Sequence, residues 1–245
     1  MKYLVDFKTV KASQLIEMFG VSLETVRRDL KCLEEQGKIK RVHGGAVIDS
    51  QRSLEISYLI REGDNLAEKR AIGQAAASLI QDGDTVVMNS GTTVFEVAKS
   101  ITARNNLTVI TNSMHVAMTL AANKSIRVFV VGGELRNPDQ VTSGFWSVEF
   151  LRHFRADKAV IGIGGIDIAS GVTDYHSAEA NIWSEMVKIA SKCIIVADYS
   201  KFGISALNLV CDLRDIEYLV TDWNTPGKEL SRYREQRIKV IVAKP

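Results

Sequence analysis

The sequence predicts an α/β protein with two parts: a small N-terminal winged helix-turn-helix and a larger domain built on a mostly parallel sheet. Near the N-terminus, two short helical patterns are followed by a basic ribbon. From about residue 68, short apolar runs alternate with helical segments. A chain of 245 residues that is 46% hydrophobic is long enough for one full core and a small extra module. We therefore expect a DNA-binding type of module over 1–48, a linker over 49–67 and the α/β domain over 68–245.

Composition excludes several classes of protein. No apolar stretch approaches the roughly 20 residues of a membrane helix, and the N-terminus has no signal-peptide core. We expect a cytoplasmic protein with no membrane partner. Cys32, Cys193 and Cys211 have no CxxC spacing, and the histidines form no ligand pattern with them, so we expect no disulfide, metal or cofactor. The net charge of +2 does not indicate nucleic-acid binding, which must depend on local placement.

The first helical pattern contains Leu15, Ile16 and Phe19 at helical spacing and ends at Gly20, where a positive φ is favoured. Ser22 then caps a second helix that runs to about Gln36 and stops at Gly37.

The second helix has an apolar face formed by Val26, Leu30 and Leu33. Its remaining surface carries the groups expected to meet DNA: Ser22, Thr25, Arg27, Arg28 and Lys31. A helix, a tight turn and a second helix with such groups near its start place side chains in a major groove, where arginine suits guanine edges and phosphates. The alternative is an ordinary solvated face, because Glu24, Asp29, Glu34 and Glu35 offset the positive charge.

The segment "KIKRVHGGAV" predicts a small β-hairpin, or wing. Its cationic residues alternate with apolar ones: Lys38, Lys40 and Arg41 with Ile39 and Val42. The pair Gly44–Gly45 would let the backbone approach a sugar-phosphate strand.

The stretch "FGVSLETVRRDLKCLEEQGKIKRVHGGAV" closely resembles the DeoR family of bacterial transcriptional regulators. The resemblance implies a double-stranded DNA operator as partner, with Ser22, Thr25, Arg27 and Arg28 on the recognition helix and Lys40, Arg41 and His43 on the wing. Taken alone, His43 is more often a structural residue. In the family a full helix precedes the helix pair, whereas only "MKYLVDFKT" stands before "VKASQL" here. We expect either a start further upstream or a loosened DNA-binding domain.

Seven apolar runs predict strands buried on both faces, hence a parallel sheet flanked by helices: "DTVVMN", "LTVITN", "IRVFVVGG", "KAVIGIGG", "KCIIVAD", "EYLVTD" and "IKVIVA". Polar or glycine-rich residues follow these runs. Open α/β sheets bind ligands at the carboxyl ends of their strands, so we expect the loops to converge on one crevice.

The loop "NSGTT" lies between a strand and a helix. Hydroxyl groups and free N–H groups at a helix N-terminus favour an anion, so Ser90, Gly91, Thr92 and Thr93 are predicted to hold a phosphate. Simple capping by Ser90 or Thr92 is the alternative. Lys201 in "DYSKFG" lies at another strand end and favours the phosphate interpretation.

The C-terminal part also resembles the DeoR sensor domain, through "EKRAIGQAAASLIQDGDTV", "NSGTT", "LTVITNS", "VVGGELR", "IGIGGID", "GVTDYHSAEA" and "ADYSKFG". That domain is related in fold to ribose-5-phosphate isomerase, glucosamine-6-phosphate deaminase and coenzyme A transferases. The resemblance implies a phosphorylated sugar or related metabolite as effector, held by Ser90, Gly91, Thr92, Thr93 and Lys201, with Arg136 and Glu179 nearby.

Four positions depart from the family pattern. Asn89 occupies a position where the family commonly has Asp, and Gly164 occupies the position of the Asp in the family's Ala-Asp-Gly. The stretch Thr173–His176 replaces a frequent Thr-Thr-x-Asn, and Trp183 replaces a lysine. Cations are therefore missing near the expected pocket. Trp183 is either a packing residue or an aromatic that stacks on the sugar ring.

These observations predict a transcriptional regulator, a repressor of a sugar-metabolism operon that a phosphorylated sugar releases, acting as a homodimer or homotetramer. The linker would transmit the signal. The alternative is a sugar-phosphate isomerase or deaminase with an accessory domain, using Asp174, Glu179 or Asp198. We expect no catalytic residue, partly because Gly164 replaces one candidate acid.

Overall fold

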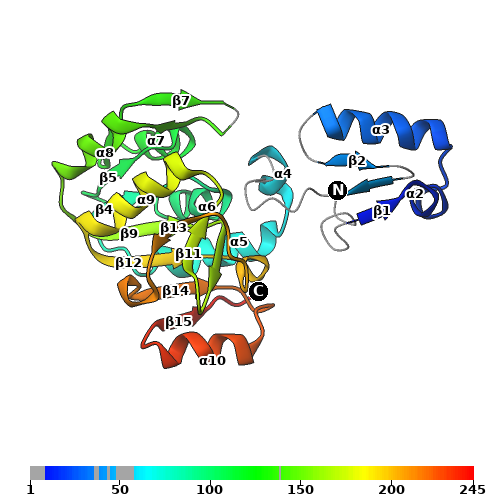
Figure 1. The fold of residues 1–245 in the computed structure, drawn as a ribbon. Helices are drawn as coiled ribbons and strands as arrows, with labels where there is room; N and C mark the ends of the chain where they lie inside the picture. Colours follow the sequence, from blue (N-terminus) through cyan, green and yellow to red (C-terminus); the bar gives the residue numbers. More distant parts are fainter. Residues whose placement is uncertain (1–8, 36–38, 43–44, 48–57, 138) are drawn as a thin grey trace. The chain divides into compact units, whose positions relative to one another are not determined.

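The computed structural model describes residues 9–35, 39–42, 45–47, 58–137 and 139–245. The chain divides into two compact units, Met1–Ile56 and Ser57–Pro245, and the boundary falls within the predicted linker. The linker range also contains α4 (Tyr58–Gly63) and the start of α5 (Leu66–Ala77). Figure 1 shows both units. Every helix of the described residues is too short or too polar to span a bilayer.

The N-terminal unit contains the predicted helix pair and hairpin, α2 (Ala12–Phe19), α3 (Leu23–Glu35), β2 (Lys40–Val42) and β3 (Gly45–Val47). An additional strand, β1 (Thr9–Lys11), was not predicted and completes an antiparallel sheet in the order β1-β3-β2. Gly20 ends α2 with φ 60°, as expected. The core consists of Val10, Val26, Leu30, Ile39 and Ala46. Phe19, by contrast, is exposed.

The seven predicted apolar runs form one parallel sheet in the order β15-β14-β12-β9-β4-β5-β6. Its strands are β4 (Thr85–Met88), β5 (Thr108–Thr111), β6 (Arg127–Val130), β9 (Ala156–Gly162), β12 (Ala190–Val196), β14 (Tyr218–Thr221) and β15 (Lys239–Val242). The chain first builds outward from β4 through β5 to β6 and then outward on the other side from β9. The direction of winding reverses between β4 and β9, and open sheets bind ligands at such a point.

Helices cover both faces of the sheet (Figure 1). The helices α5, α6 (Thr92–Ser100) and α7 (Met114–Ala121) pack on the face that buries Val86 and Met88. The opposite face buries Val87 beneath α8 (Phe145–Arg152), α9 (Ser177–Ile189) and α10 (Gly227–Glu235). Because successive residues of a central strand face opposite helix layers, adjacent positions such as Val86, Val87 and Met88 are all apolar. This explains the continuous apolar runs.

Two smaller antiparallel sheets were not predicted. One is the hairpin of β7 (Glu134–Arg136) and β8 (Val141–Ser143), and the other has the order β10-β11-β13. The second comprises β10 (Gly165–Asp167), β11 (Gly171–Asp174) and β13 (Asn208–Cys211).

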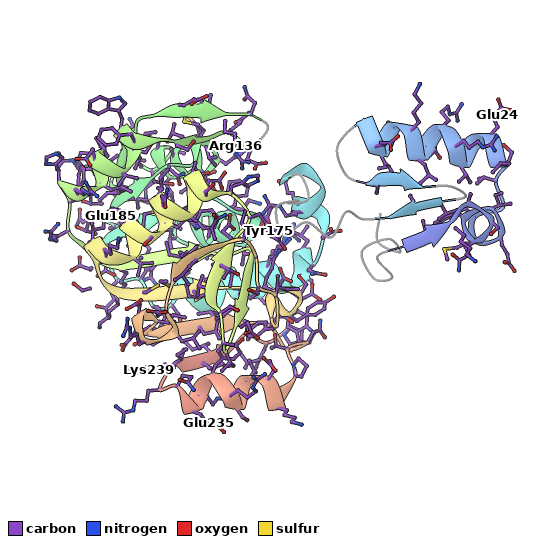
Figure 2. All side chains as sticks on the ribbon, viewed as in Figure 1. Glu24, Arg136, Tyr175, Glu185, Glu235 and Lys239 are labelled. Carbon is purple, nitrogen blue, oxygen red and sulfur yellow. The ribbon has the colours of Figure 1, made fainter. Side chains whose placement is uncertain are left out.

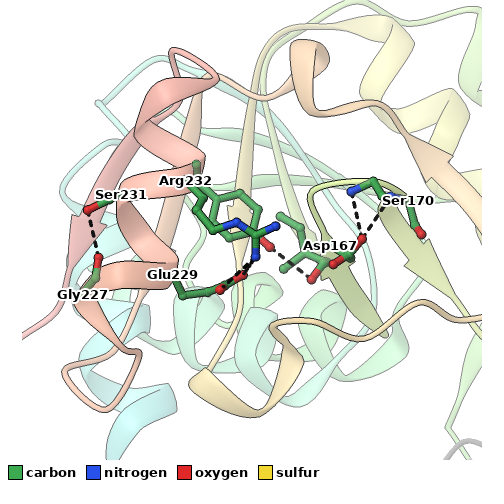
Figure 3. A network of polar contacts seen from close by, with 9 residues as sticks. Asp167, Ser170, Gly227, Glu229, Ser231 and Arg232 are labelled. Carbon is green, nitrogen blue, oxygen red and sulfur yellow. Dashed lines mark hydrogen bonds and ion pairs between the residues drawn. The ribbon is translucent and has the colours of Figure 1, made fainter.

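Polar contacts hold β10 against α10. The Tyr233 hydroxyl donates to the carbonyl of Ile166 (3.2 Å). Close by, the Asp167 carboxylate accepts from the N–H groups of Ala169 and Ser170, and Glu229 pairs with Arg232 (Figure 3). These contacts fix the hairpin that follows the central strand β9. Short 3-10 turns, η1 (Tyr199–Lys201) and η2 (Leu213–Asp215), complete the unit.

Candidate functional site

The helix α3 presents the predicted DNA-facing side chains to solvent. Arg27, Arg28 and Lys31 are exposed, whereas Val26 and Leu30 on the opposite face are buried. The nearest acid to Arg28 among the described ion pairs is Asp29, at 4.0 Å, and both side chains are largely exposed. An exposed pair of this length contributes little free energy, so the guanidinium is available to a partner.

Ser22 begins α3 as predicted. Its hydroxyl accepts a hydrogen bond from the N–H of Thr25 (3.2 Å), and the two hydroxyls lie 3.0 Å apart. Both groups therefore stabilise the first turn of the helix, at the end that would enter a groove.

The backbone of Lys40 and Arg41 lies in β2, on the predicted wing, while His43 and Lys38 lie outside the described residues. Of the predicted glycine pair, Gly44 lies outside the described residues and Gly45 has a role within the unit. A Cβ at this position would lie 2.0 Å from the carbonyl oxygen of Val10, so Gly45 is required by the close approach of β1 within the unit. The approach of DNA is not needed to explain it.

The loop between β4 and α6 forms an open helix N-terminus. Gly91 is the N-cap, with φ 136°, and no side chain caps the helix. The alternative in which Ser90 or Thr92 is the cap is therefore wrong. No atom lies within 4 Å of the position that a Cβ of Gly91 would occupy. The first-turn N–H groups therefore have no side-chain cap, and such a helix end favours an anion.

The hydroxyl-bearing residues of this loop, Ser90, Thr92 and Thr93, are 6–7% exposed. A Cβ at Gly162, the last residue of β9, would lie 3.5 Å from the carbonyl oxygen of Ser90. The loop is therefore directly beside the end of β9, at the reversal of winding.

The loop that carries Lys201 lies on the other side of β9. Its Gly203 N–H donates to the carbonyl of Ile166 (2.9 Å), just beyond β9, and Ile204 packs against Gly165. In the sheet, β9 lies between β12 and β4. The two predicted loops thus flank the end of one strand, as expected of a shared crevice.

Lys69 was not predicted as a site residue. It is 4% exposed and lies on the buried face of α5 with Ile72, Gly73 and Ala76. Because α5 precedes β4 and α6 follows it, both helices begin at the carboxyl edge of the sheet. A lysine in register with the buried face of a helix is the signal that could have identified this residue.

The Lys69 ammonium donates to the carbonyl oxygens of Arg61 and Asp64 (2.5 Å to Asp64), close to the end of α4. Burial lowers its pKa to about 8; the carboxylate of Asp198 opposes this shift, and the charge of Lys201 adds to it. Arg61 and Asp64 act on it as well, so three cations and two carboxylates gather beside the start of α5.

Polar side chains tie the start of α5 to neighbouring strand ends. The Asn65 amide donates to Asp198 (3.1 Å), whose carboxylate also accepts from the Ser200 hydroxyl (2.5 Å). Asn224, which follows β14, donates to Glu68 (2.9 Å). Asp198 is thus part of a structural network.

Asn89 explains the first departure from the family pattern. Its amide donates to the carbonyl of Gly162 (2.8 Å), and its carbonyl accepts from the N–H of the same residue (2.8 Å). Aspartate could not donate the first bond. Asn89 therefore joins β4 to β9.

Arg136 and Glu179, both predicted to lie near the effector, are in contact with each other. The Arg136 guanidinium lies 2.5 Å from the Glu179 carboxylate and also pairs with Asp139. Both carboxylates are almost fully buried. Figure 2 shows Arg136 and Tyr175 at the same end of the α/β unit. Because two carboxylates pair with one guanidinium, this cluster has a net negative charge.

A side chain at Gly164 would require its neighbours to shift. A Cβ there would lie 2.8 Å from a carboxylate oxygen of Asp174 and 3.0 Å from the ring of Tyr175. The acid that is common in the family at this position could not be accommodated without displacing both neighbours.

Trp183 is 3% exposed and belongs to the core beneath α9, as the packing interpretation predicted. Its indole N–H, however, has no hydrogen-bond partner among the described residues. Packing alone leaves this polar group unsatisfied.

Comparison with family models agrees with this architecture. Residues 1–52 match the DeoR-like helix-turn-helix domain, and residues 64–223 match the DeoR C terminal sensor domain. The chain belongs to the DeoR family. Its seven-stranded sheet is the scaffold of the sensor domain and its winged helix that of the DNA-binding domain.

Several relatives of this DeoR-family chain are named repressors. It is 35% identical to the transcriptional repressor AccR of Agrobacterium fabrum, over 98% of this chain and 93% of the relative. It is 36% identical to the HTH-type transcriptional repressor GlcR of Bacillus subtilis, over 90% of this chain and 84% of that one. It is 33% identical to the glycerol-3-phosphate regulon repressor of Escherichia coli, over 94% of this chain and 91% of that relative.

Solved structures show more distant similarity. Ribose 5-phosphate isomerase of Plasmodium falciparum has a TM-score of 0.41 at 17% identity, over 55% of this chain and 52% of that one. The delta subunit of eIF2B from Chaetomium thermophilum has a TM-score of 0.45 at 17% identity, over 66% and 57%. The matched region thus spans little more than half of either chain.

Proposed function

We propose that this DeoR-family chain is a transcriptional repressor of a sugar-metabolism operon, and that a phosphorylated sugar releases it from its operator. It would act in the cytoplasm, where bacterial DNA lies. Family membership supports the regulatory role, and the named relatives are repressors.

On the DNA side, α3 would enter the major groove. Arg27, Arg28 and Lys31 are exposed and lie just beyond the capped first turn, where recognition helices contact bases and phosphates. Ser22 and Thr25 would contact the backbone, and Lys40, Arg41 and His43 on the wing would contact an adjacent groove or phosphates.

On the effector side, the open N-terminus of α6 is the observation that carries the proposal. A Cβ at Gly91 would meet no atom beyond those of its chain neighbours, and the adjacent residues Ser90, Thr92 and Thr93 carry hydroxyl groups. Lys201 and Lys69, on the opposite side of the β9 end, would add positive charge. Helix N–H groups, hydroxyls and cations together suit a phosphate dianion.

Coupling to DNA would run through α4. Lys69 holds the carbonyl oxygens of Arg61 and Asp64, so an anion that attracts Lys69 competes with those two bonds. The segment 49–57 leads from α4 to the DNA-binding unit. An effector changes DNA affinity only if it binds one of these states more tightly.

We further propose that the chain is not an enzyme. Isomerase chemistry requires a carboxylate within reach of a carbon-bound proton. Gly164 excludes an acid from one position, Glu179 is paired with Arg136, and Asp198 accepts three hydrogen bonds from Asn65 and Ser200.

Assembly as a homodimer or homotetramer is also proposed, because one winged helix reads a short half-site. Large apolar side chains are exposed near α7 and α8. Met118 and Leu135 line one depression of about 430 Å³, and Phe145 packs edge-to-face on Trp146. Light scattering at micromolar concentration tests this proposal, and a monomeric wild type would contradict it.

The central experiment selects a high-affinity duplex from a random library and follows its release by fluorescence anisotropy. Phosphorylated sugars and sugar alcohols are added one at a time, with their dephosphorylated forms as controls. We expect release by one or more phosphorylated compounds, with each compound recovered unchanged. Release by a dephosphorylated form alone would contradict the phosphate site, and turnover would contradict the regulatory assignment.

A further inference from the structure

Three buried polar atoms near the Arg136 cluster have no hydrogen-bond partner within the described part of the chain. They are Asn112 Oδ1, Arg136 Nε and Trp183 Nε1. Buried polar groups are nearly always hydrogen-bonded, because an unpaired one costs roughly 1–3 kcal/mol. Their number in one region indicates a place that could bind the polar groups of a ligand.

The three residues are connected through β8 and α9. Arg136 lies opposite Val141 in the β7–β8 ladder, and the Asn112 amide donates to the carbonyl of Thr142 (3.0 Å). Asn112 and Arg136 therefore flank the same strand.

On the other side of Arg136 lies α9. The guanidinium contacts Glu179, and Trp183 is one helical turn beyond Glu179 on the same face. The unpaired atoms thus come from the end of β5, from β7 and from the first half of α9.

The chemistry of the three atoms defines what fits them. Arg136 Nε and Trp183 Nε1 donate, whereas Asn112 Oδ1 accepts. A hydroxyl group both accepts and donates, so adjacent hydroxyls of one molecule satisfy all three. An ammonium group cannot accept, and a carboxylate or phosphate cannot donate to Asn112.

The charge of the region also favours hydroxyl groups over an anion. Asp139, Asp174 and Glu179 are all less than a tenth exposed, and Arg136 is the cation paired with two of them. A further anion in this low-dielectric region would be repelled, while carboxylates accept readily from hydroxyl groups.

We propose that Asn112, Arg136 and Trp183 form a subsite for the neutral, polyhydroxylated end of the effector, and that the buried carboxylates exclude a second anionic group there. This inference rests on the proposed function, since the phosphate end would lie at α6. The effector class is therefore a sugar or sugar-alcohol monophosphate, and sugar acids and bisphosphates are rejected.

Calorimetry with matched ligand pairs tests the subsite on the full chain. The pairs are sorbitol 6-phosphate with 6-phosphogluconate, and glycerol 3-phosphate with 3-phosphoglycerate; in each pair a terminal alcohol is replaced by a carboxylate. Inorganic phosphate reports on the α6 site alone. We expect one or both alcohols to bind about tenfold more tightly than inorganic phosphate and than the matching acid. An acid that binds as tightly as its alcohol, or alcohols no tighter than inorganic phosphate, would overturn the subsite.

Variants assign the effect to residues. Trp183→Phe removes the indole N–H and keeps an aromatic ring, and Arg136→Lys removes the Nε–H with the rest of the guanidinium and keeps the charge. We expect roughly threefold to tenfold weaker binding of the alcohol and unchanged binding of inorganic phosphate. The matched control, Arg152→Lys, changes an exposed residue of α8 and should have no effect.

The outcomes separate the two proposals. Unchanged alcohol binding by both variants refutes the subsite even if phosphate still binds. Absence of inorganic phosphate binding by the wild type refutes the phosphate site of the proposed function. Thermal melting shows whether each variant is folded. Glu179→Gln removes one buried carboxylate, so it should reduce the difference in affinity between each alcohol and its matching acid.

Discussion

The two units place their candidate functional residues in opposite environments. In the N-terminal unit, Arg27, Arg28 and Lys31 project from one helix into solvent. In the α/β unit, Lys69 and Glu179 are less than a tenth exposed and come from different helices. The first arrangement suits a large, highly charged partner, and the second suits a small molecule enclosed by loops. It follows that damage to one unit should leave the other functional.

The largest expected effect tests this independence. Leu30 is 5% exposed in a small core, so Leu30→Asp buries an unpaired charge and should unfold the N-terminal unit. We expect operator binding to be abolished and calorimetric binding of inorganic phosphate to be retained. Leu207→Asp, at an exposed position of the α/β unit, is the control. Loss of both activities in Leu30→Asp would show that the units depend on each other.

A smaller effect is expected from the exposed face of α3. Arg28→Ala should weaken specific operator binding by roughly 1–3 kcal/mol and reduce the dependence of affinity on salt. Anisotropy titrations at several salt concentrations measure both quantities. Arg234→Ala, an exposed change on α10, should alter neither. Unchanged affinity in Arg28→Ala would remove this residue from the DNA interface.

Substitutions at two glycines with positive φ test the phosphate site at α6. Gly91 has φ 136° and Gly83 has φ 89°, and both have space for a Cβ. Alanine at either position should lower the free energy of unfolding by about 1–3 kcal/mol, because both backbones are unfavourable for L-residues. Gly91→Ala alone should also weaken inorganic phosphate binding, by about tenfold. Equal phosphate binding in both variants would contradict the site at α6.

The smallest effect concerns the protonation of Lys69. Its folded pKa of about 8 lies below the ordinary 10.5, so the unfolded chain binds more protons between these values. Stability should therefore rise with pH across this window in the wild type, relative to Lys69→Gln.

A bound phosphate should raise the pKa of Lys69 and cause uptake of less than one proton at pH 8. Calorimetry in buffers of different ionisation enthalpy measures this uptake. Lys188→Gln, an exposed change, is the control. Equal uptake by the wild type and Lys69→Gln would place Lys69 away from the ligand.

Much of this protein was determined by sequence alone. The seven apolar runs became the seven strands of one parallel sheet, and Gly20 and Ser22 define the turn between α2 and α3. Periodicity, capping and turn chemistry depend on neighbours in sequence, so these features can be read locally.

The tertiary structure decided the rest. Arg136 meets Glu179, Asn89 binds Gly162, and the thiol of Cys211 and burial together raise the pKa of the Cys193 thiol. No local pattern predicts such pairs, since each joins segments that only folding brings together. Lys69 illustrates the reason. Its place on the buried face of α5 was visible in sequence, but the carbonyls that hold it and the charges that shift its pKa come from two other segments, residues 61–64 and 198–201.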